Sequence, residues 1–438
     1  MIDIKFTPEK NGILVDEGNT FDVLFRASST ENDSTKKTQR LPLNLSIVID
    51  RSGSMQGQPL DEAKKCASML VDRMGEKDRL SIVMYGADAE VLVPSQPVTD
   101  KRKFKSQIDA IYASGMTALY DGWSLGAEEV AKNSHSNSIS RVLLLSDGQA
   151  NRGLVDEDVI ATHCQKMAEI GVSTSTYGLS GYFNENLMVG MASAGQGQAH
   201  YGQTAEDLLD PFQEEFDLLE AILSRRIRLR ILPEKGVSFE ILNGYSQDGE
   251  GRFILPDLAF GADVWALIQI KINSKICSQQ PETKLKILSA YIDYMDHDGV
   301  DQRSETAKLI IDLCTREQFA CLELDETVKS RVTEVRAATL QEVAQVAARS
   351  ENWAKVDQTM LALAELGEEN EWIKASVQRL KAYSTRRQRE SFSKETLYKS
   401  RKMKQRSVAK NEEIFSSRSE YGRPSYLRRK MEQGKREL

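Results

Sequence analysis

Alternating strand-like and helical patterns across residues 43–223 constrain the fold of this chain more than any other feature of its sequence. Three short apolar runs have the composition of buried strands: 43–49, 79–86 and 141–146. Between these runs, apolar residues recur at the three- and four-residue spacing of an amphipathic helix, as in segment 59–74. Such alternation is typical of an α/β domain, so we predict a doubly wound, mostly parallel sheet with helices on both faces.

Strand-like segments without intervening helices flank this α/β region on both sides. Segment 2–29 carries two or three β-prone runs, and residues 225–297 carry several more that are separated by turn residues. Consecutive strands of this kind favour an antiparallel sandwich. We therefore expect the two flanks to form one β-sandwich into which the α/β domain is inserted.

The remainder of the chain is expected to be helical and then basic. From about residue 306 to 383, the spacing of Ala, Leu and Val predicts a small helical bundle. The basic segment that follows is rich in serine and poor in apolar anchors, so we expect a largely disordered tail with some helix. The predicted organisation is N-terminal sandwich strands 1–40, α/β domain 41–224, sandwich 225–300, helical bundle 301–383 and tail 384–438.

The net charge of −7 conceals an asymmetry between the body and the tail. Residues 381–438 contain 18 Lys and Arg against 7 Asp and Glu, a balance of +11 that leaves −18 for the rest of the chain. Such a tail is either solvated or docks on an acidic surface, of a partner or of its own body. Nucleic-acid binding is disfavoured, because the acidic body repels phosphate.

Cysteine usage and the absence of targeting patterns point to an intracellular protein. The five cysteines are scattered and never spaced as CxxC, which favours free thiols in a reducing compartment. No apolar run approaches the roughly 20 residues that span a bilayer. The N-terminal residues lack the basic and apolar blocks of a signal peptide. We therefore expect a cytoplasmic location and no membrane span.

A carboxylate and two hydroxyls follow the first strand of the α/β region at alternate positions. Asp50, Ser52 and Ser54 form the pattern D-x-S-x-S in a loop that also contains glycine. Thr117 precedes a predicted helix, and Asp147 follows the third apolar run. Doubly wound sheets bind ligands in the loops at the carboxyl ends of their strands, where both aspartates are expected to lie.

These residues, in this order, resemble the metal-ion-dependent adhesion site of von Willebrand factor A (vWA) domains. The resemblance covers about residues 42–223 and includes every position of the motif: Asp50, Ser52, Ser54, Thr117 and Asp147. It implies a divalent cation bound directly by both serine hydroxyls, by the threonine directly or through water, and by the aspartates mainly through water. It also implies an open coordination position that accepts an Asp or Glu carboxylate of a partner protein.

The chemistry of these side chains supports a hard cation. Carboxylate, hydroxyl and water oxygens suit Mg²⁺, with Mn²⁺ or Ca²⁺ as alternatives, rather than zinc. The four histidines are isolated from one another along the chain, which argues against a histidine-based zinc site. A simpler interpretation of Asp50, Ser52 and Ser54 remains, because Ser and Asp after a strand commonly cap the next helix.

The resemblance favours a non-catalytic adaptor or scaffold protein. The layout is similar to that of bacterial vWA proteins, which often work with MoxR-type AAA+ ATPases, or with protein kinases and PP2C-type phosphatases. Two alternatives stay open. A metal-activated water would make the chain a hydrolase, although no general base accompanies the motif. A metal with only a structural role would leave partner binding to the sandwich or to the helices.

Three other motifs receive simpler interpretations. The glycine-rich segments lack the Lys-Ser/Thr of a P-loop, which disfavours nucleotide binding. The acidic segment 293–306 lacks the spacing of a calcium loop, and we interpret it as a hairpin turn. Trp353 and Trp372 lie at helical positions and are interpreted as core residues.

Overall fold

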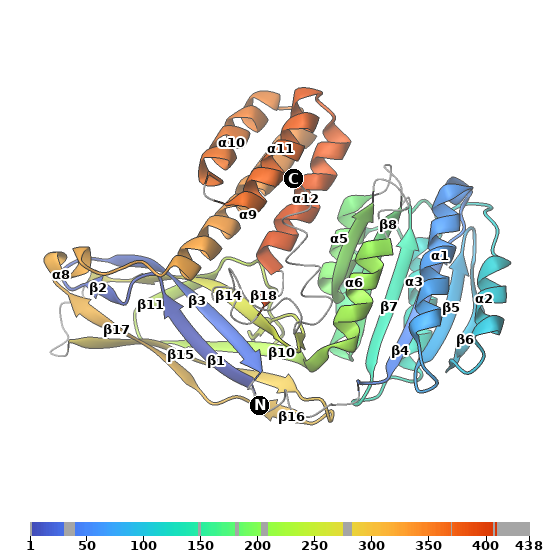
Figure 1. The fold of residues 1–438 in the computed structure, drawn as a ribbon, viewed down its shortest axis with the longest axis horizontal. Helices are drawn as coiled ribbons and strands as arrows, with labels where there is room; N and C mark the ends of the chain where they lie inside the picture. The colour runs from blue at the N-terminus through green and yellow to red at the C-terminus, as the bar shows by residue number, and fades with distance from the viewer. Residues whose placement is uncertain are drawn as a thin grey trace, which may run out of the picture. The chain divides into compact units, whose positions relative to one another are not determined.

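The computed structural model divides the chain into two compact units. The residues it describes are 2–29, 40–147, 150–179, 184–202, 209–274, 283–368, 370–405 and 408–409. One unit spans Gln39–Ala221, and the other combines Met1–Thr38 with Ile222–Leu438. The first unit therefore interrupts the second along the sequence. Figure 1 shows the elements of both units.

A six-stranded sheet forms the centre of the inserted unit (Figure 1). Its strands are β4 (Leu43–Asp50), β5 (Arg79–Tyr85), β6 (Ala89–Pro97), β7 (Ile139–Ser146), β8 (Val172–Leu179) and β9 (Gln196–Gly202). Their order across the sheet is β6-β5-β4-β7-β8-β9, and within this sheet only the edge strand β6 runs antiparallel to its neighbour. Every residue of β4 and β7 is buried, so both faces of these strands are covered.

Helices alternate with these strands along the chain. They are α1 (Gln58–Arg73), α2 (Lys101–Asp109), α3 (Leu119–Ala131), α4 (Glu157–Glu169), α5 (Glu185–Ala194) and α6 (Leu209–Glu220). Local signals set their starts: α1 has a proline in its first turn, and the Asp156 side chain caps α4 by accepting from two backbone N–H groups. The prediction of a doubly wound α/β domain is confirmed.

Two further sheets, drawn from segments on both sides of the insertion, form the second unit. The first contains β1 (Ile2–Pro8), β3 (Asn19–Ser29), β14 (Ala262–Ile272) and β11 (Val237–Ile241), with β18 (Val408–Ala409) pairing to β14. The second contains β12 (Phe253–Ile254), β10 (Ile222–Pro233), β15 (Lys284–Met295), β17 (Ala307–Cys314) and β2 (Gly12–Leu14), with β13 (Leu258–Ala259) and β16 (Asp301–Arg303) at its margins. Both sheets share one buried apolar cluster, to which Phe25, Ile268 and Ile292 belong. Strands that precede the insertion thus pack with strands that follow it.

Helices follow β17 in the second unit and precede the short strand β18. They are α8 (Arg316–Ala320), α9 (Glu326–Arg349), α10 (Trp353–Leu366), α11 (Glu371–Thr385) and α12 (Arg389–Gln405). The long helix α9 contacts α10 and α12 around a buried apolar cluster, and its first turns pack Val332 near Trp265 of β14. Trp353 and Trp372 lie partly buried against the cluster between the helices, as expected of core residues.

The boundary between strands and helices differs from the prediction. A helical bundle was expected from residue 301, but β16 and β17 continue the second sheet as far as Cys314. In β17, Leu309 and Ile311 are buried while the residues between and before them are exposed, which is the two-residue period of a strand. A short apolar run gives little basis for separating a strand from a helical turn, so the prediction for this segment is wrong.

The basic tail was expected to be largely disordered with some helix. Arg389–Gln405 forms α12, which is the helical part within the described residues. Phe392 and Met403 lie eleven residues apart, about three helical turns, and both are buried in the cluster shared with α9. Phe392 and Met403 thus pack this charged helix against α9. Residues 410–438 lie outside the described residues.

The acidic segment 293–306 was expected to form a hairpin turn. Segment 293–306 forms a β-hairpin between β15 and β16, in which Asp296 accepts hydrogen bonds from the backbone N–H groups of Val300 and Gly299. The hairpin interpretation is confirmed.

In the part of the chain that the structure describes, no helix is both long and apolar enough to cross a membrane.

Candidate metal centre

Asp50 is the last residue of β4 and the most constrained side chain of the candidate site. It is fully buried. Its Oδ1 accepts a hydrogen bond from the backbone N–H of Ser52 at 2.8 Å. Its Oδ2 accepts from the Ser146 hydroxyl at 2.7 Å and from the Tyr85 hydroxyl at 3.2 Å. Donors from three neighbouring segments therefore fix the orientation of this carboxyl group.

Asp147 follows β7 directly, and its charge acts on the carboxyl group of Asp50. Both carboxyl groups are buried. They lie near each other because β4 and β7 are adjacent parallel strands whose carboxyl ends meet at the same end of the sheet. Burial raises the pKa of Asp50, and the charge of Asp147 raises it further. Hydrogen bonds from Ser146 and Ser52 lower it again, and the net pKa is about 6. A cation bound beside these two buried carboxyl groups would favour the charged form of Asp50.

The hydroxyls of Ser52 and Ser54 converge in the loop after β4. The two Oγ atoms are 3.1 Å apart, and the residues between β4 and α1 include a short 3₁₀ turn, Gly53–Met55. Ser52 is buried, whereas Ser54 is exposed. The pair thus presents one hydroxyl from inside the loop and one from its surface.

Thr117 lies in the segment before α3 and is buried. Its backbone N–H donates to Asn151 Oδ1 at 2.9 Å, and its carbonyl accepts from the backbone N–H of Asn151 at 3.2 Å. Asn151 belongs to the loop that follows β7 and Asp147. Two hydrogen bonds therefore join the Thr117 segment to the Asp147 loop.

The Thr117 segment is also joined to the loop after β4. Gly53 N donates to the Gly115 carbonyl at 3.0 Å, and Ser114 N donates to the Arg51 carbonyl at 2.6 Å. Gly86, after β5, must be glycine here, since a Cβ at this position would meet the Ser114 carbonyl at 2.8 Å. Close backbone approach thus holds the three loops together at the carboxyl end of the sheet.

The oxygen donors present here fit a hard divalent cation. Hydroxyl and carboxylate oxygens are the ligands that Mg²⁺ and Ca²⁺ prefer. Among the described residues, no group of three or more His, Cys, Asp or Glu side chains has the arrangement of a metal site. A cation at this edge would therefore depend on the hydroxyls of Ser52, Ser54 and Thr117 in addition to the two aspartates.

Sequence reasoning identified the five candidate side chains but not the residues that hold them. Ser146 and Tyr85 orient Asp50, and Asn151 links Thr117 to the Asp147 loop. A partial signal existed for Ser146, which ends an otherwise apolar run one residue before Asp147. Asn151 carried no such signal, because asparagine in a glycine-containing loop commonly bonds its own neighbours.

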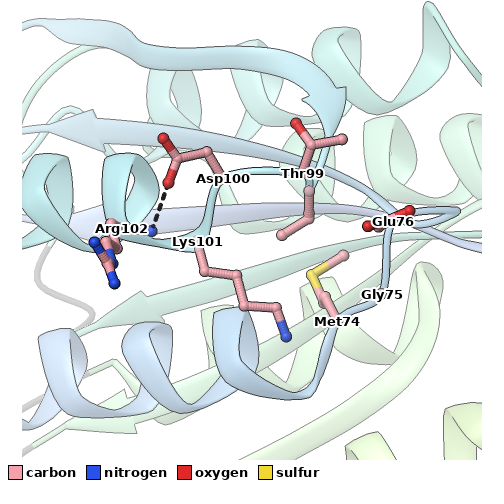
Figure 2. Close-up of a pocket in the computed structure, with 8 residues that line it drawn as sticks. Met74, Gly75, Glu76, Thr99, Asp100, Lys101 and Arg102 are labelled. Carbon is pink, nitrogen blue, oxygen red and sulfur yellow. Dashed lines mark hydrogen bonds between the residues drawn. The ribbon is translucent and has the colours of Figure 1, made fainter.

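An open hollow lies at the other end of the sheet, where β5 begins and β6 ends (Figure 2). It is lined by the residues before β5 and after β6: Met74, Gly75, Glu76, Val98, Thr99, Asp100, Lys101 and Arg102. Arg79 begins β5, whereas the candidate centre lies beside its last residue, Tyr85. The Asp100 side chain already caps α2 by accepting from the backbone N–H of Arg102. The hollow is therefore separate from the candidate metal centre.

Comparison with known proteins assigns the inserted unit to a family of domains. Residues 44–215 match the family model described as the von Willebrand factor type A domain. The uncharacterized protein sll0103 of Synechocystis sp. is 31% identical over 202 residues, covering 45% of this chain and 46% of that protein. The uncharacterized protein YfbK of Escherichia coli is 30% identical over 199 residues, covering 45% and 35%. The chain spans less than half the length of these curated relatives.

Solved structures extend the likeness of fold to most of the chain. A von Willebrand factor type A protein from Catenulispora acidiphila has a TM-score of 0.67 at 14% identity, covering 86% of this chain and 89% of that one. The ArnB paralog VWA2 from Sulfolobus acidocaldarius has a TM-score of 0.60 at 16% identity, covering 92% and 98%. The family model thus matches residues 44–215 as a vWA domain, and the two solved structures show a similar fold over most of the chain.

Proposed function

We propose that the vWA domain of residues 44–215 binds a partner protein through a divalent cation, and that the chain acts as a non-catalytic adaptor or scaffold. The cation, Mg²⁺ with Mn²⁺ or Ca²⁺ as alternatives, would be held by the oxygen donors of Asp50, Ser52, Ser54, Thr117 and Asp147. When bound, it supplies an electrophilic centre for an Asp or Glu carboxylate of the partner. The protein residues orient the hydroxyls and keep the aspartates desolvated.

The observation that carries this proposal is the convergence of three loops on two buried carboxyl groups. Burial and the nearby charge of Asp147 raise the pKa of Asp50, an effect that a bound cation would oppose. The loops are joined by backbone hydrogen bonds, and Asn151 has its side chain committed to the backbone of Thr117. An ordinary helix cap needs one side-chain acceptor and does not account for contributions from three loops.

The hydrogen bonds of His163 and His200 bear on the alternative of a hydrolase. A serine nucleophile or a metal-bound water needs a base within hydrogen-bond reach. The ring of His163 bonds the Tyr120 hydroxyl at 2.8 Å, and the ring of His200 bonds Glu215 at 2.9 Å. Both histidines are thus engaged with residues other than Ser52 and Ser54.

The proposal includes a cytoplasmic location and signalling or ATPase partners. Cys66, Cys164, Cys314 and Cys321 are free thiols, which suits a reducing compartment. MoxR-type ATPases and kinase–phosphatase modules are proposed from the similarity of layout to bacterial vWA proteins. The basic C-terminal residues are proposed to dock on an acidic surface of such a partner.

Partner capture with and without metal tests this function. The full chain is compared with Asp50→Ala and Thr117→Ala, in Mg²⁺ and in EDTA, and exposed Thr99→Ala serves as the matched control. We expect one set of partners to be recovered by wild type and Thr99→Ala in Mg²⁺ only. Equal recovery in every condition would contradict the adaptor function. Metal-dependent phosphoester hydrolysis that both site variants lose would favour the hydrolase instead.

A further inference from the structure

Large apolar side chains are exposed beside the candidate metal centre. Tyr112 is 71% exposed and Met116 is 49% exposed, and both belong to the segment that carries Thr117. Met116 is the residue next to Thr117 in the chain. Exposed apolar side chains next to a binding site are candidates for a contact surface with a partner.

Arg51, in the loop after β4, contacts the segment that carries Tyr112 and Met116. Its guanidinium lies 5.6 Å from the centroid of the Tyr112 ring, and its Nη1 donates to the Ser114 hydroxyl at 2.6 Å. Arg51 lies between Asp50 and Ser52 in the chain. The Tyr112 ring is therefore held next to the loop that supplies the first candidate ligands.

A second arginine lies beside the Asp147 loop. Arg152 follows Asn151, the residue that is bonded to Thr117, and pairs with Asp88 at 3.1 Å. Both members of this ion pair are exposed, and exposed pairs are easily exchanged for other partners. Arg51 and Arg152 thus place positive charge next to two of the three loops of the centre.

We infer that the partner presents an acidic segment in which the metal-binding Asp or Glu is adjacent to a bulky apolar residue. This inference rests on the function proposed above and names the chemistry of its ligand. The apolar side chain packs on Tyr112 and Met116, and the arginines favour further carboxylates in the same segment. A metal–carboxylate bond alone cannot tell one acidic protein from another, so the neighbouring contacts supply the selectivity.

Selection from a library of short random peptides with a central Asp or Glu tests this inference on the full chain. Wild type is compared with the double variant Tyr112→Ser, Met116→Ser, in Mn²⁺ and in EDTA. Leu361→Ser in α10, which replaces another exposed apolar residue, is the matched control. Because the substituted side chains are exposed, the fold is expected to be retained, and circular dichroism checks this.

We expect wild type and Leu361→Ser to enrich, in Mn²⁺ only, peptides with a bulky apolar residue beside the acid. The double variant should bind the best of these peptides about ten-fold more weakly, by the area of apolar contact removed, while its dependence on metal persists. Enrichment of acidic peptides without an apolar preference, or the same preference in the double variant, overturns the inference and leaves the proposed function standing. Absence of any metal-dependent enrichment overturns both. Metal-dependent self-association that the double variant loses would assign the surface to a second copy of the chain instead.

Discussion

Thr117 and Asn151 are joined by two hydrogen bonds, one from the Thr117 N–H to the Asn151 side chain at 2.9 Å and one from the Asn151 N–H to the Thr117 carbonyl at 3.2 Å. The pair connects the segment before α3 to the loop after β7. The Thr117 hydroxyl is a candidate ligand, whereas Asn151 is not. Asn151 is therefore a positioning residue, which fixes the backbone from which the hydroxyl extends.

Replacing Asn151 by Ala should weaken metal binding without unfolding the domain. Residues that orient metal ligands commonly account for 10- to 100-fold in affinity, so we expect a loss of about ten-fold or more. Calorimetric titration with Mn²⁺ measures the effect. The control is Asn133→Ala, which removes a bond to Ser95 elsewhere in the domain and should leave Mn²⁺ affinity unchanged. Equal affinity in wild type and Asn151→Ala would contradict the positioning role.

Replacing Gly86 by Ala should displace the Thr117 segment through a steric clash. The new Cβ would meet the Ser114 carbonyl at 2.8 Å, and backbone atoms at that distance must shift. We expect both a lower melting temperature and weaker Mn²⁺ binding. Gly190→Ala in α5 is the control, because its Cβ would meet nothing within 4 Å. In a helix that change stabilises by about 0.5–1 kcal/mol. Retained Mn²⁺ affinity in Gly86→Ala would show that the clash is absorbed elsewhere.

Glu215 of α6 lies at the centre of a buried polar cluster. Its carboxylate accepts hydrogen bonds from Arg141 at 2.8 Å and from Tyr177 at 2.5 Å, and lies 2.9 Å from the ring of His200. Burial by itself raises the pKa of Glu215, but the hydrogen bond from His200 and the charge of Arg141 outweigh it and lower the pKa to about 2. We expect Glu215→Gln to lower the free energy of unfolding at pH 7 by about 3 kcal/mol, since it leaves Arg141 buried without its carboxylate.

The contribution of Glu215 should disappear in acid. Because its pKa in the folded state lies below the ordinary value of 4.5, the stabilisation is present above pH 4.5 and is lost as the pH falls towards 2. Urea denaturation of wild type and Glu215→Gln across this range measures the difference between them, which should shrink. Glu90→Gln, an exposed position, should show a small and constant difference. A gap for Glu215→Gln that stays constant down to pH 2 would contradict this assignment.

Replacing Phe392 by Ala should undock α12 from α9. Phe392 is fully buried, and truncation of such a ring typically costs about 3–5 kcal/mol. Hydrogen exchange of α12, measured by mass spectrometry, should accelerate strongly in this variant. Exposed Lys402→Ala in the same helix is the control and should leave the exchange unchanged. Rapid exchange of α12 in the wild type already would contradict the docked helix.

The α/β architecture could be predicted from the sequence because the strongest signals for it are local. Apolar runs such as that ending at Asp50, followed by helical spacing, indicate a buried parallel strand and its crossover helix. The five candidate metal ligands were identified differently, because their order along the chain resembles the metal-site motif of vWA domains. The bonds of Asn151 and Tyr85 were not predictable, because they depend on how loops distant in sequence approach one another.

The error at β17 and the unspecified position of the helix in the tail both arise from weak local signals. Leu309 and Ile311 alternate as in a strand, but the run is short, and only the pairing with β15 decides its structure. Phe392 and Met403 are the few apolar anchors of a charged segment, and burial against α9 outweighs the unfavourable composition. In both places tertiary packing, which one segment does not reveal, selects the structure.

Titration of the full chain with Mg²⁺, followed by calorimetry, tests the central claim most directly. The account predicts one ion bound per wild-type chain and per Thr99→Ala chain, and loss of that binding in Asp50→Ala and in Thr117→Ala. Binding of the same strength in all four proteins, or no binding to the wild type, would contradict a metal centre formed by these three loops.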